Sequence, residues 1–253
     1  MIIYEIIANI NMREVLENMN YIDKTREEWE ELAPDIAVLP LGSFEQHGPH
    51  LPLGTDIYIV EALSSGIAEA LGAYLLPVQP VSTCYEHHGK RGSFHYSADV
   101  FYRMIVCLLE KLYENGFRKI TVIPGHGGIF VLEPAVGYIK AKYPDADVII
   151  VSPYDRGDLP GWPFGDDGLH ADDMETSLML RIKPELVDMA KAVDFVPDKP
   201  RPYLNYGSIF TICPDGVWGS ATRATGEKGA WLLENAVVKT AERIKNYFGK
   251  GGR

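Results

Sequence analysis

The segment from Leu39 to Asp56, LPLGSFEQHGPHLPLGTD, carries four side chains that can bind a metal ion or transfer a proton: Glu45, His47, His50 and Asp56. In an extended segment, side chains two residues apart point the same way, so Glu45 and His47 can face one cation or two adjacent ones. A carboxylate such as that of Asp56 can bridge two metal ions, which lie about 3.5–4 Å apart in two-metal hydrolases. Carboxylate and imidazole ligands together suit Zn, Mn or Fe.

A polar connecting loop is the alternative interpretation of this segment. Asp56 comes just before a helical pattern, where a carboxylate is also a good N-cap. We expect His50 to order the loop rather than to bind metal. The glycines and prolines of the segment make it stiff, which suits a metal site whose ligands are held in place beforehand.

Two further histidines follow predicted strands. His126 stands between glycines in PGHGG, residues 124–128, where the backbone must turn sharply. His170 precedes a helix in GLHADDMETSLML, residues 168–180, whose inner face would carry Glu175. Taken alone, His126 could be a turn histidine bonded to backbone, and Glu175 could face solvent. If Glu175 is buried it needs a partner, either as a ligand or as a group that supports one.

The segment EHHGKRGSFHYSAD, residues 86–99, is locally basic within an acidic protein. Its charge would suit a phosphate or carboxylate group of a substrate. The alternative is a solvated loop that contacts a neighbouring subunit. The candidates for contacts with substrate are Ser82, Glu86, His87 and Asp167.

The elements that must position these residues follow from short apolar runs that alternate with longer amphipathic ones. Strands are predicted over Ile36–Leu41, Tyr74–Val78, Lys119–Ile123 and Val148–Ser152, and helices over Ile57–Leu71, Ala98–Asn115, Val131–Lys142, Asp172–Ile182 and Glu227–Tyr247. This alternation predicts a single α/β domain over residues 1–253, with a mostly parallel sheet, helices on both of its faces and a frayed end at residues 249–253. Sites in such sheets lie at the carboxyl ends of the strands, so the loops that carry histidine would meet at one edge.

The overall composition excludes several classes of function. The chain has 253 residues, of which 46% are hydrophobic and 23% charged, and its formal net charge is -11. It therefore lacks the basic character of a nucleic-acid-binding protein. Three cysteines without CxxC spacing indicate neither a disulfide framework nor a thiolate zinc site. We see no signal peptide and no apolar run of the ~20 residues that a membrane span needs, and we expect a cytoplasmic protein without nucleic-acid or membrane partners.

The three metal-binding motifs, in this order and at these separations, resemble those of the creatininase family, also called the creatinine amidohydrolase family. The resemblance runs from about Ala37 to Gly229 and includes the segments GFRKITVIPGHGG and ATRATGEKG. It implies a three-layer α/β/α architecture and a homo-oligomer, often a hexamer. It also implies a two-metal amidohydrolase that cleaves an amide of a small molecule.

Carried over to this sequence, the resemblance implies that Glu45, Asp56 and His126 hold one metal ion, while His47 and Asp56 hold the other. Zn is the expected metal, with Fe and Mn as alternatives. A metal-activated water would attack the amide carbonyl. His170 matches the family histidine near the scissile bond, and either it or Glu175 would protonate the leaving nitrogen.

Two departures from creatininase concern the second metal ion and the substrate. In creatininase, Tyr and Glu follow the metal-binding histidine, and that Glu binds the second metal; here the two positions are Gly127 and Gly128. The tryptophan that stacks on creatinine corresponds to Asp166, although Trp162 lies nearby in sequence. The second site therefore needs another ligand, and we expect a formamide or a cyclic amide as substrate rather than creatinine.

Other branches of the family leave alternatives open. The Gly-Gly form occurs in the archaeal formamide hydrolase of flavin and deazaflavin biosynthesis, which is one alternative function. A metal-binding member that trims peptides, or that has no catalytic role, is another.

Overall fold

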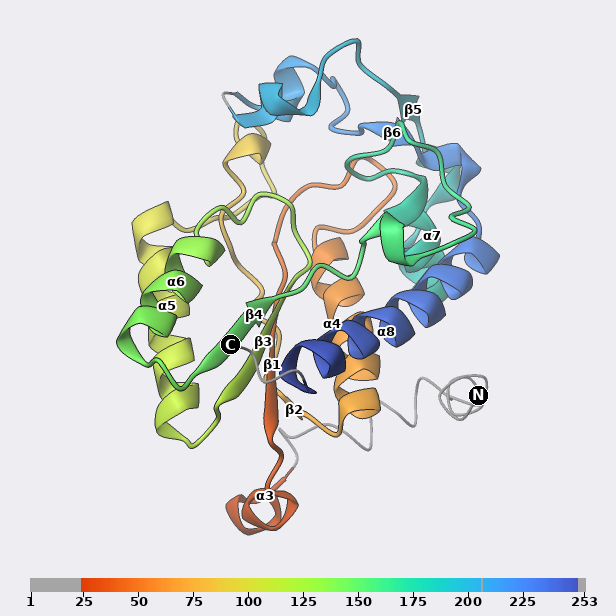
Figure 1. Ribbon diagram of the computed structural model, residues 1–253. Coiled ribbons are helices and arrows are strands. Elements are labelled where there is room, and N and C mark those ends of the chain that lie inside the picture. The colour runs from red at the N-terminus through yellow and green to blue at the C-terminus, as the bar shows by residue number, and fades with distance from the viewer. Residues whose placement is uncertain (1–23, 206, 250–253) are drawn as a thin grey trace.

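The computed structural model of the protein describes residues 24–205 and 207–249 (Figure 1). Its α-helices and strands are, in chain order, α3 (Arg26–Leu32), β1 (Ile36–Leu41), α4 (Thr55–Leu71), β2 (Tyr74–Leu75), α5 (Ala98–Glu114), β3 (Lys119–Pro124), α6 (Leu132–Lys142), β4 (Asp147–Ile150), α7 (Asp173–Ile182), β5 (Asp194–Phe195), β6 (Gly219–Ser220) and α8 (Gly226–Gly249). The 3₁₀ helices are η2 (Tyr85–His87), η3 (Arg156–Asp158), η4 (Pro184–Leu186), η5 (Met189–Lys191), η6 (Arg201–Asn205), η7 (Ile209–Thr211) and η8 (Ala221–Arg223).

Four strands form one parallel sheet in the order β2-β1-β3-β4. The central pair is β1 and β3, which run in register from Ile36 opposite Lys119 to Leu41 opposite Pro124. Because all neighbours in this sheet are parallel, the carboxyl ends of its strands meet at the same edge. The sequence prediction of an α/β fold with a parallel sheet is confirmed.

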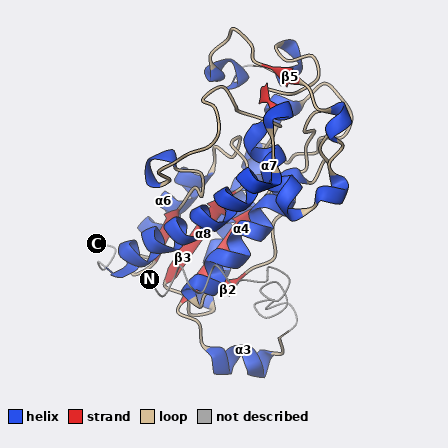
Figure 2. Cartoon of the chain, turned by 90° about the vertical axis from the view of Figure 1, so that its right-hand side faces the viewer, coloured by secondary structure: helices blue, strands red, loops and turns tan. Residues whose placement is uncertain are grey.

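Alternating side chains of β1 and β3 supply the cores on the two faces of the sheet. Leu39 and Val122 belong to the core beneath α5 and α6. Val38 and Ile123 belong to the core beneath α4, α7 and α8. Figure 1 shows the resulting three layers, with α5 and α6 on one side of the sheet and α4 and α8 on the other. Figure 2, turned by 90°, shows α4 and α8 side by side over their face.

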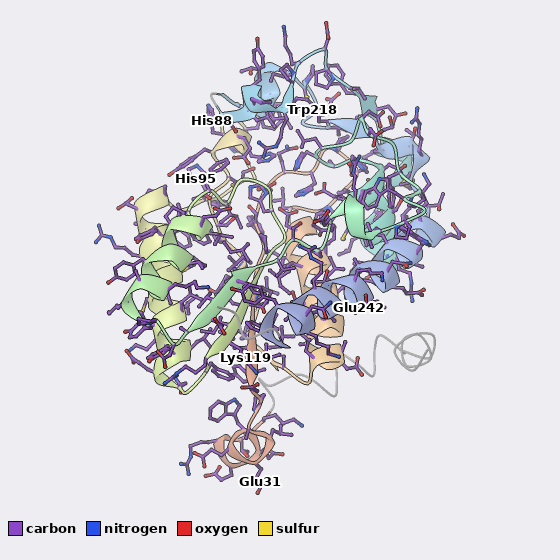
Figure 3. All side chains as sticks on the ribbon, in the orientation of Figure 1. Glu31, His88, His95, Lys119, Trp218 and Glu242 are labelled. Atoms are coloured by element: carbon purple, nitrogen blue, oxygen red, sulfur yellow. The ribbon has the colours of Figure 1, made fainter. Side chains whose placement is uncertain are left out.

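The chain after β4 gathers beyond the carboxyl ends of the strands. Lys119, the first residue of β3, lies in the lower half of Figure 3, whereas Trp218, just before β6, lies near the top of the molecule. The Trp218 backbone forms a bridge with His170: the Trp218 N–H donates to the His170 carbonyl at 2.9 Å, and the His170 N–H donates back at 3.1 Å. This bridge holds His170 at the end of the molecule where the strands terminate.

The structure differs from the sequence prediction at several boundaries. Helix α3 was not predicted; it begins after Thr25, which forms a capping box with Glu28. Strand β2 ends at Leu75 rather than Val78, because Pro77 lacks the N–H that a ladder needs. The segment still follows β1, since the Gln79 N–H donates to the Pro40 carbonyl at 3.0 Å.

Residues 1–23 and 250–253, which include most of the expected frayed end, lie outside the described residues, and α8 runs to Gly249. No helix in the described part of the chain is long and apolar enough to cross a membrane.

Helices α7 and α8 approach each other closely at one glycine. A Cβ atom on Gly229 of α8 would lie 1.9 Å from the backbone oxygen of Ser177 in α7. That oxygen cannot move unless the helix moves with it. Gly229 therefore fixes the distance between α8 and the helix that carries Glu175.

We expect Gly229→Ala to destabilise the protein by about 1–3 kcal/mol, because the added methyl group overpacks the contact between the helices. Gly137→Ala is the matched control, since Gly137 is also a helix glycine but has no atom within 4 Å of the added position. There, alanine should stabilise the helix by about 0.5–1 kcal/mol. Urea denaturation of both variants measures the difference, and equal midpoints would contradict the packing argument.

Candidate metal centre

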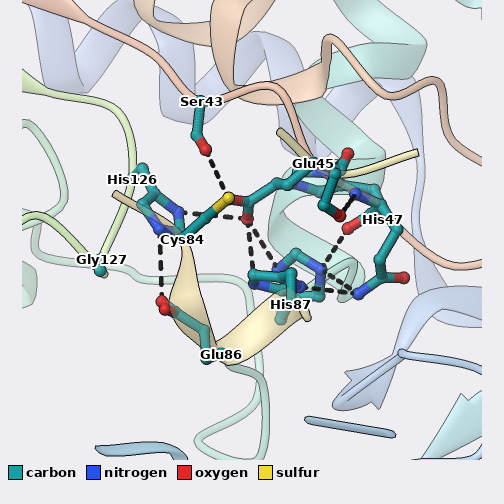
Figure 4. A network of polar contacts seen from close by, with 12 residues as sticks. Ser43, Glu45, His47, Cys84, Glu86, His87, His126 and Gly127 are labelled. Carbon is teal, nitrogen blue, oxygen red and sulfur yellow. Dashed lines mark hydrogen bonds and ion pairs between the residues drawn. The ribbon is translucent and has the colours of Figure 1, made fainter. Parts of the chain in front are cut away.

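Glu45, Asp56 and His126 form a buried group with the geometry of a metal site. His126 Nδ1 lies 3.1 Å from Glu45 Oε1 and 3.4 Å from Asp56 Oδ2 (Figure 4 shows His126 beside Glu45). Glu45 and Asp56 are 0% and 2% exposed. The same two carboxylate oxygens are buried and accept no hydrogen bond. Buried anionic oxygens without donors require a positive charge, and a divalent cation among these three ligand atoms would supply it.

The second oxygen of Asp56 faces His47. Asp56 Oδ1 lies 3.2 Å from His47 Nε2, so the two oxygens of this carboxylate point to two different histidines. Asp56 is the second residue of α4, and Gly54 is the N-cap. The capping interpretation of Asp56 is therefore wrong. The arrangement suits a carboxylate that bridges two metal ions.

His47 is oriented by the backbone. Its Nδ1 lies 3.1 Å from the Glu45 carbonyl, which only accepts hydrogen bonds, so we assign the ring proton to Nδ1. Its Nε2 then faces Asp56 Oδ1 at 3.2 Å and Glu175 Oε2 at 3.7 Å. Burial acts to lower the pKa of His47, but the carboxylates of Asp56 and Glu175 raise it to about 10. A cation bound at Nε2 would take the place of that proton.

His170 and Glu175 complete a second group of ligand atoms. One ligand atom from each of His47, His170 and Glu175 lies within 4.8 Å of the others. His170 is 6% exposed, and its Nε2 lies 2.8 Å from the Gln46 carbonyl, to which it donates. Burial and the neighbouring His87 and His47 hold the pKa of His170 well below its ordinary value, so the ring is neutral with a lone pair on Nδ1.

Glu175 reaches the site from the first turn of α7. The helix begins after Asp172, whose Oδ1 accepts the Glu175 N–H at 3.0 Å. The Glu175 carboxylate accepts the Ala171 N–H at 2.6 Å, and Ala171 has a φ of 48°, in the left-handed region. Burial and the nearby Asp56 and Asp172 raise the pKa of Glu175 to about 8, although His47 opposes the shift.

Opposite charges balance around Glu45 and His126. Burial acts to raise the pKa of Glu45, but His126 and His87 outweigh it and hold the pKa well below its ordinary value. Burial acts to lower the pKa of His126, but Glu45 and Asp56 raise it well above its ordinary value. The Ser43 hydroxyl donates to Glu45 Oε2 at 2.6 Å, so Oε1 is the oxygen left for a cation.

Glu86 and His87, expected to contact substrate, lie against the candidate ligands. His87 Nε2 is 3.1 Å from Glu45 Oε1, and Glu86 Oε1 is 3.3 Å from His126 Nε2 (Figure 4). The His126 ring thus has Glu45 and Asp56 at one nitrogen and Glu86 at the other. Such a carboxylate on the outer nitrogen orients a metal-binding histidine and makes it more basic. The role of both residues in substrate binding stays a prediction.

Gly128 leaves the space that Glu86 occupies. A Cβ atom on Gly128 would lie 2.1 Å from Glu86 Oε1 and 2.4 Å from His126 Nε2. No side chain fits there while Glu86 contacts the ring. The glycine at this position and the carboxylate of Glu86 are therefore physically linked.

The other predicted site residues have separate surroundings. Asp167 accepts a hydrogen bond from the Ser220 hydroxyl at 3.0 Å, and buried Ser82 lies 3.5 Å from the Thr83 carbonyl. Neither contact involves the carboxylate and histidine group. His50 contacts the Thr176 hydroxyl at 2.9 Å, as expected of a residue that orders the loop. In the basic segment, His88 is exposed (Figure 3).

Gln46 is a site residue that sequence reasoning missed. Its side-chain nitrogen lies 2.9 Å from His87 Nδ1 and 3.1 Å from His170 Nε2, and it donates to the Gly216 carbonyl at 3.2 Å. Gln46 therefore joins three segments that are distant in sequence. Its position between Glu45 and His47 could have indicated a role in the site. The alternation of an extended segment instead predicts that the side chain of Gln46 points away from those of its two neighbours.

Comparison with known proteins points in the same direction as the geometry. Residues 23–244 match the family model described as "Creatininase: Creatinine amidohydrolase". A 3-dehydro-scyllo-inosose hydrolase of Thermotoga maritima is 30% identical, covering 86% of this chain and 80% of that protein. A creatinine amidohydrolase of Pseudomonas putida is 28% identical, covering 84% and 90%. A mycofactocin precursor peptide peptidase of Mycobacterium ulcerans is 30% identical, covering 83% and 84%.

Solved structures share the fold. A crystal structure of creatininase superposes with a TM-score of 0.79 at 24% identity, covering 89% of this chain and 96% of the other. A creatininase described as a Mn form superposes with a TM-score of 0.76 at 26% identity, covering 89% and 97%. Another creatininase structure is described as a Zn-Zn type.

We expect Gly128→Ala to reduce the metal content of the purified protein, because the added methyl group displaces Glu86 and the His126 ring. Loss of a carboxylate that orients a metal-binding histidine typically lowers metal affinity by about 10–100-fold. Gly127→Ala is the matched control, since its nearest neighbour would be the flexible Arg201 side chain at 3.6 Å. Titration of the metal-free proteins with Zn²⁺ measures both affinities, and unchanged binding by Gly128→Ala would contradict the packing argument.

Proposed function

Because the chain belongs to the creatininase family, we propose that it is a metal-dependent amidohydrolase that cleaves a carbon–nitrogen bond, other than a peptide bond, in a small molecule. The observation that carries this proposal is the pair of buried carboxylates, Glu45 and Asp56, whose unpartnered oxygens face His126. The residues present fit two divalent metal ions. We propose Zn as the metal, with Mn or Fe as alternatives.

Each proposed ligand atom follows from the orientation of its side chain. Glu45 Oε1, Asp56 Oδ2 and His126 Nδ1 would hold one ion, and Asp56 Oδ1 and His47 Nε2 would hold the other. Divalent metal ions at such a site supply an activated water and polarise the carbonyl oxygen of a substrate. The chain holds its ligands ready for this, because backbone carbonyls fix the ring protons of His47 and His170.

His170 is the group we propose for proton transfer. Its Nε2–H is committed to the Gln46 carbonyl, so Nδ1 can accept a proton from the attacking water and pass it to the leaving nitrogen. Its ring is neutral, because burial and the neighbouring His87 and His47 hold its pKa well below the ordinary value. Glu175 is the other candidate for this role from the sequence. A protonated Glu175 could also donate.

The substrate class rests on a relative and on the departures from creatininase. A creatinine amidohydrolase is similar over most of the chain, which supports an amide substrate. Gly127 and Gly128 supply no side chain at two positions that differ from creatininase, so we propose a formamide or a cyclic amide other than creatinine. The similarity to a peptide peptidase makes a short peptide the alternative.

We further propose a cytoplasmic homo-oligomer, with a hexamer as one form. The oligomer is supported by exposed apolar side chains within and just after the basic segment 86–99, where Phe94 and Val100 are 64% and 48% exposed.

Metal analysis together with substrate hydrolysis tests the proposed function. We expect protein purified without added metal to contain about two divalent ions per chain. It should hydrolyse at least one member of a panel of formamides and cyclic amides, which would release formate and an amine from a formamide and open the ring of a cyclic amide. Asp56→Asn should lose both ions and all hydrolysis, whereas the control Asp35→Asn, at a 71% exposed side chain just before the amino end of β1, should keep both ions and full hydrolysis.

Several outcomes would refute the proposal. A wild-type protein without bound metal, or full metal occupancy in Asp56→Asn, would refute the bridged site. Turnover of only 3-dehydro-scyllo-inosose, the substrate of the Thermotoga relative, or of only short peptides would refute the proposed bond type.

Replacement of the proposed proton-transfer group should separate rate from metal content. We expect His170→Gln to lower the rate of hydrolysis by about 10²–10⁴-fold, the typical contribution of a general acid or base, while metal content is unchanged. Asp35→Asn, at an exposed side chain just before the amino end of β1, is the control and should retain full activity. A His170→Gln protein that has lost a metal ion would instead place His170 among the ligands.

A further inference from the structure

The second ion of the proposed centre has too few ligands from the chain. His47 and Asp56 contribute one atom each. Residue 128 cannot contribute, because it is glycine and the space beside it holds the Glu86 carboxylate. Glu86 itself faces the outer nitrogen of His126 rather than His47. A further ligand must therefore come from another element.

Glu175 is the second carboxylate that faces His47 Nε2. Its Oε2 lies 3.7 Å from His47 Nε2, the same nitrogen that faces Asp56 at 3.2 Å. The Glu175 side chain is 15% exposed, so it is not fully enclosed by the chain. The ligand atoms of His47 and Glu175 belong to one group within 4.8 Å. The 3.7 Å between His47 Nε2 and Glu175 Oε2 is a separation that two atoms bound to one ion at about 2.0–2.2 Å each can have.

The backbone before α7 holds Glu175 in this direction. Ala171, at a φ of 48°, directs its N–H to Glu175 Oε2, and Asp172 caps the Glu175 N–H. A carboxylate oxygen that accepts one hydrogen bond keeps a lone pair, and the second oxygen is also available. In addition, the close approach of Gly229 in α8 to the backbone of Ser177 fixes the position of α7, the helix that carries Glu175.

We propose that Glu175 binds the second metal ion and supplies the carboxylate that residue 128 cannot provide. The inference rests on the proposed two-metal function and changes the role of Glu175 from proton donor to ligand. The second ion would then have His47 Nε2, Asp56 Oδ1 and a Glu175 oxygen as its ligands from the chain, with His170 beside it.

Metal stoichiometry of the full-length protein tests this assignment without any need for a substrate. Metal-free wild type and Glu175→Gln are each titrated with Zn²⁺ by calorimetry, and the bound metal is counted after dialysis. We expect two ions per wild-type chain and one per Glu175→Gln chain. The affinity for the remaining ion should be unchanged, because Glu45 and His126 are not altered.

Asp173→Asn is the matched control on the same helix. Asp173 is 6% exposed and pairs with Lys228 at 2.7 Å, so the change from acid to amide disturbs α7 without touching the site. This variant should bind two ions. If Glu175→Gln does not fold, Glu175→Asp replaces it, and the shorter side chain should weaken only the second ion, by at least 10-fold.

The outcomes separate this inference from the function on which it rests. Two ions retained by Glu175→Gln, or both ions lost from it while it remains folded, would overturn the role of Glu175 as ligand to the second ion. Loss of one ion from Asp173→Asn as well would also overturn it, because the cause would then be general damage to α7. No metal bound to the wild type would refute the proposed function itself.

Discussion

The burial of Glu45 and Asp56 beyond the carboxyl end of β1 is the constraint on which the rest of the site depends. Ionised carboxylates that lose their water need donors or cations in return, and the cost of leaving them uncompensated is several kcal/mol per ion. Here one oxygen of Glu45 receives a serine hydroxyl, but its other oxygen and one oxygen of Asp56 receive no donor. Imidazole rings face these two oxygens instead. The nitrogen of an imidazole that faces a carboxylate can either carry a proton or bind a metal ion.

The histidines that face these carboxylates are held by the backbone rather than by one another. His47 and His170 each direct one ring nitrogen to a carbonyl, of Glu45 and Gln46 respectively, and so present the other nitrogen to the carboxylates. His170 is in turn fixed by its bridge with Trp218. A site whose ring orientations are set by main-chain groups changes little when a cation replaces a proton, which is the condition for preorganised metal binding.

Sequence reasoning found the residues that the parallel sheet brings together by itself. Glu45 and His126 each follow a central strand, so the topology alone places them at one edge. Sequence reasoning could not find the contacts that depend on how the loops fold. The side chain of Gln46 should have pointed away from those of Glu45 and His47 by the alternation of an extended segment, yet the loop turns and brings it to His87. Similarly, the chain continues beside β1 past Pro77 without forming a regular strand, a boundary that periodicity cannot resolve.

The charge of the whole buried group limits how its members can vary. The carboxylates of Glu45, Asp56, Glu86 and Glu175 carry four negative charges when ionised, which two divalent cations would balance if the imidazoles are neutral. Burial acts to raise the pKa of Glu86, but the interaction with His126 outweighs it and leaves the pKa below its ordinary value, so the charge of Glu86 is part of this sum. A glutamate at position 128 would add a fifth charge in a space that Glu86 already fills. Glycine at this position thus avoids both a steric and an electrostatic conflict, and a chain that keeps Glu86 on the His126 ring has to draw the remaining carboxylate ligand from α7.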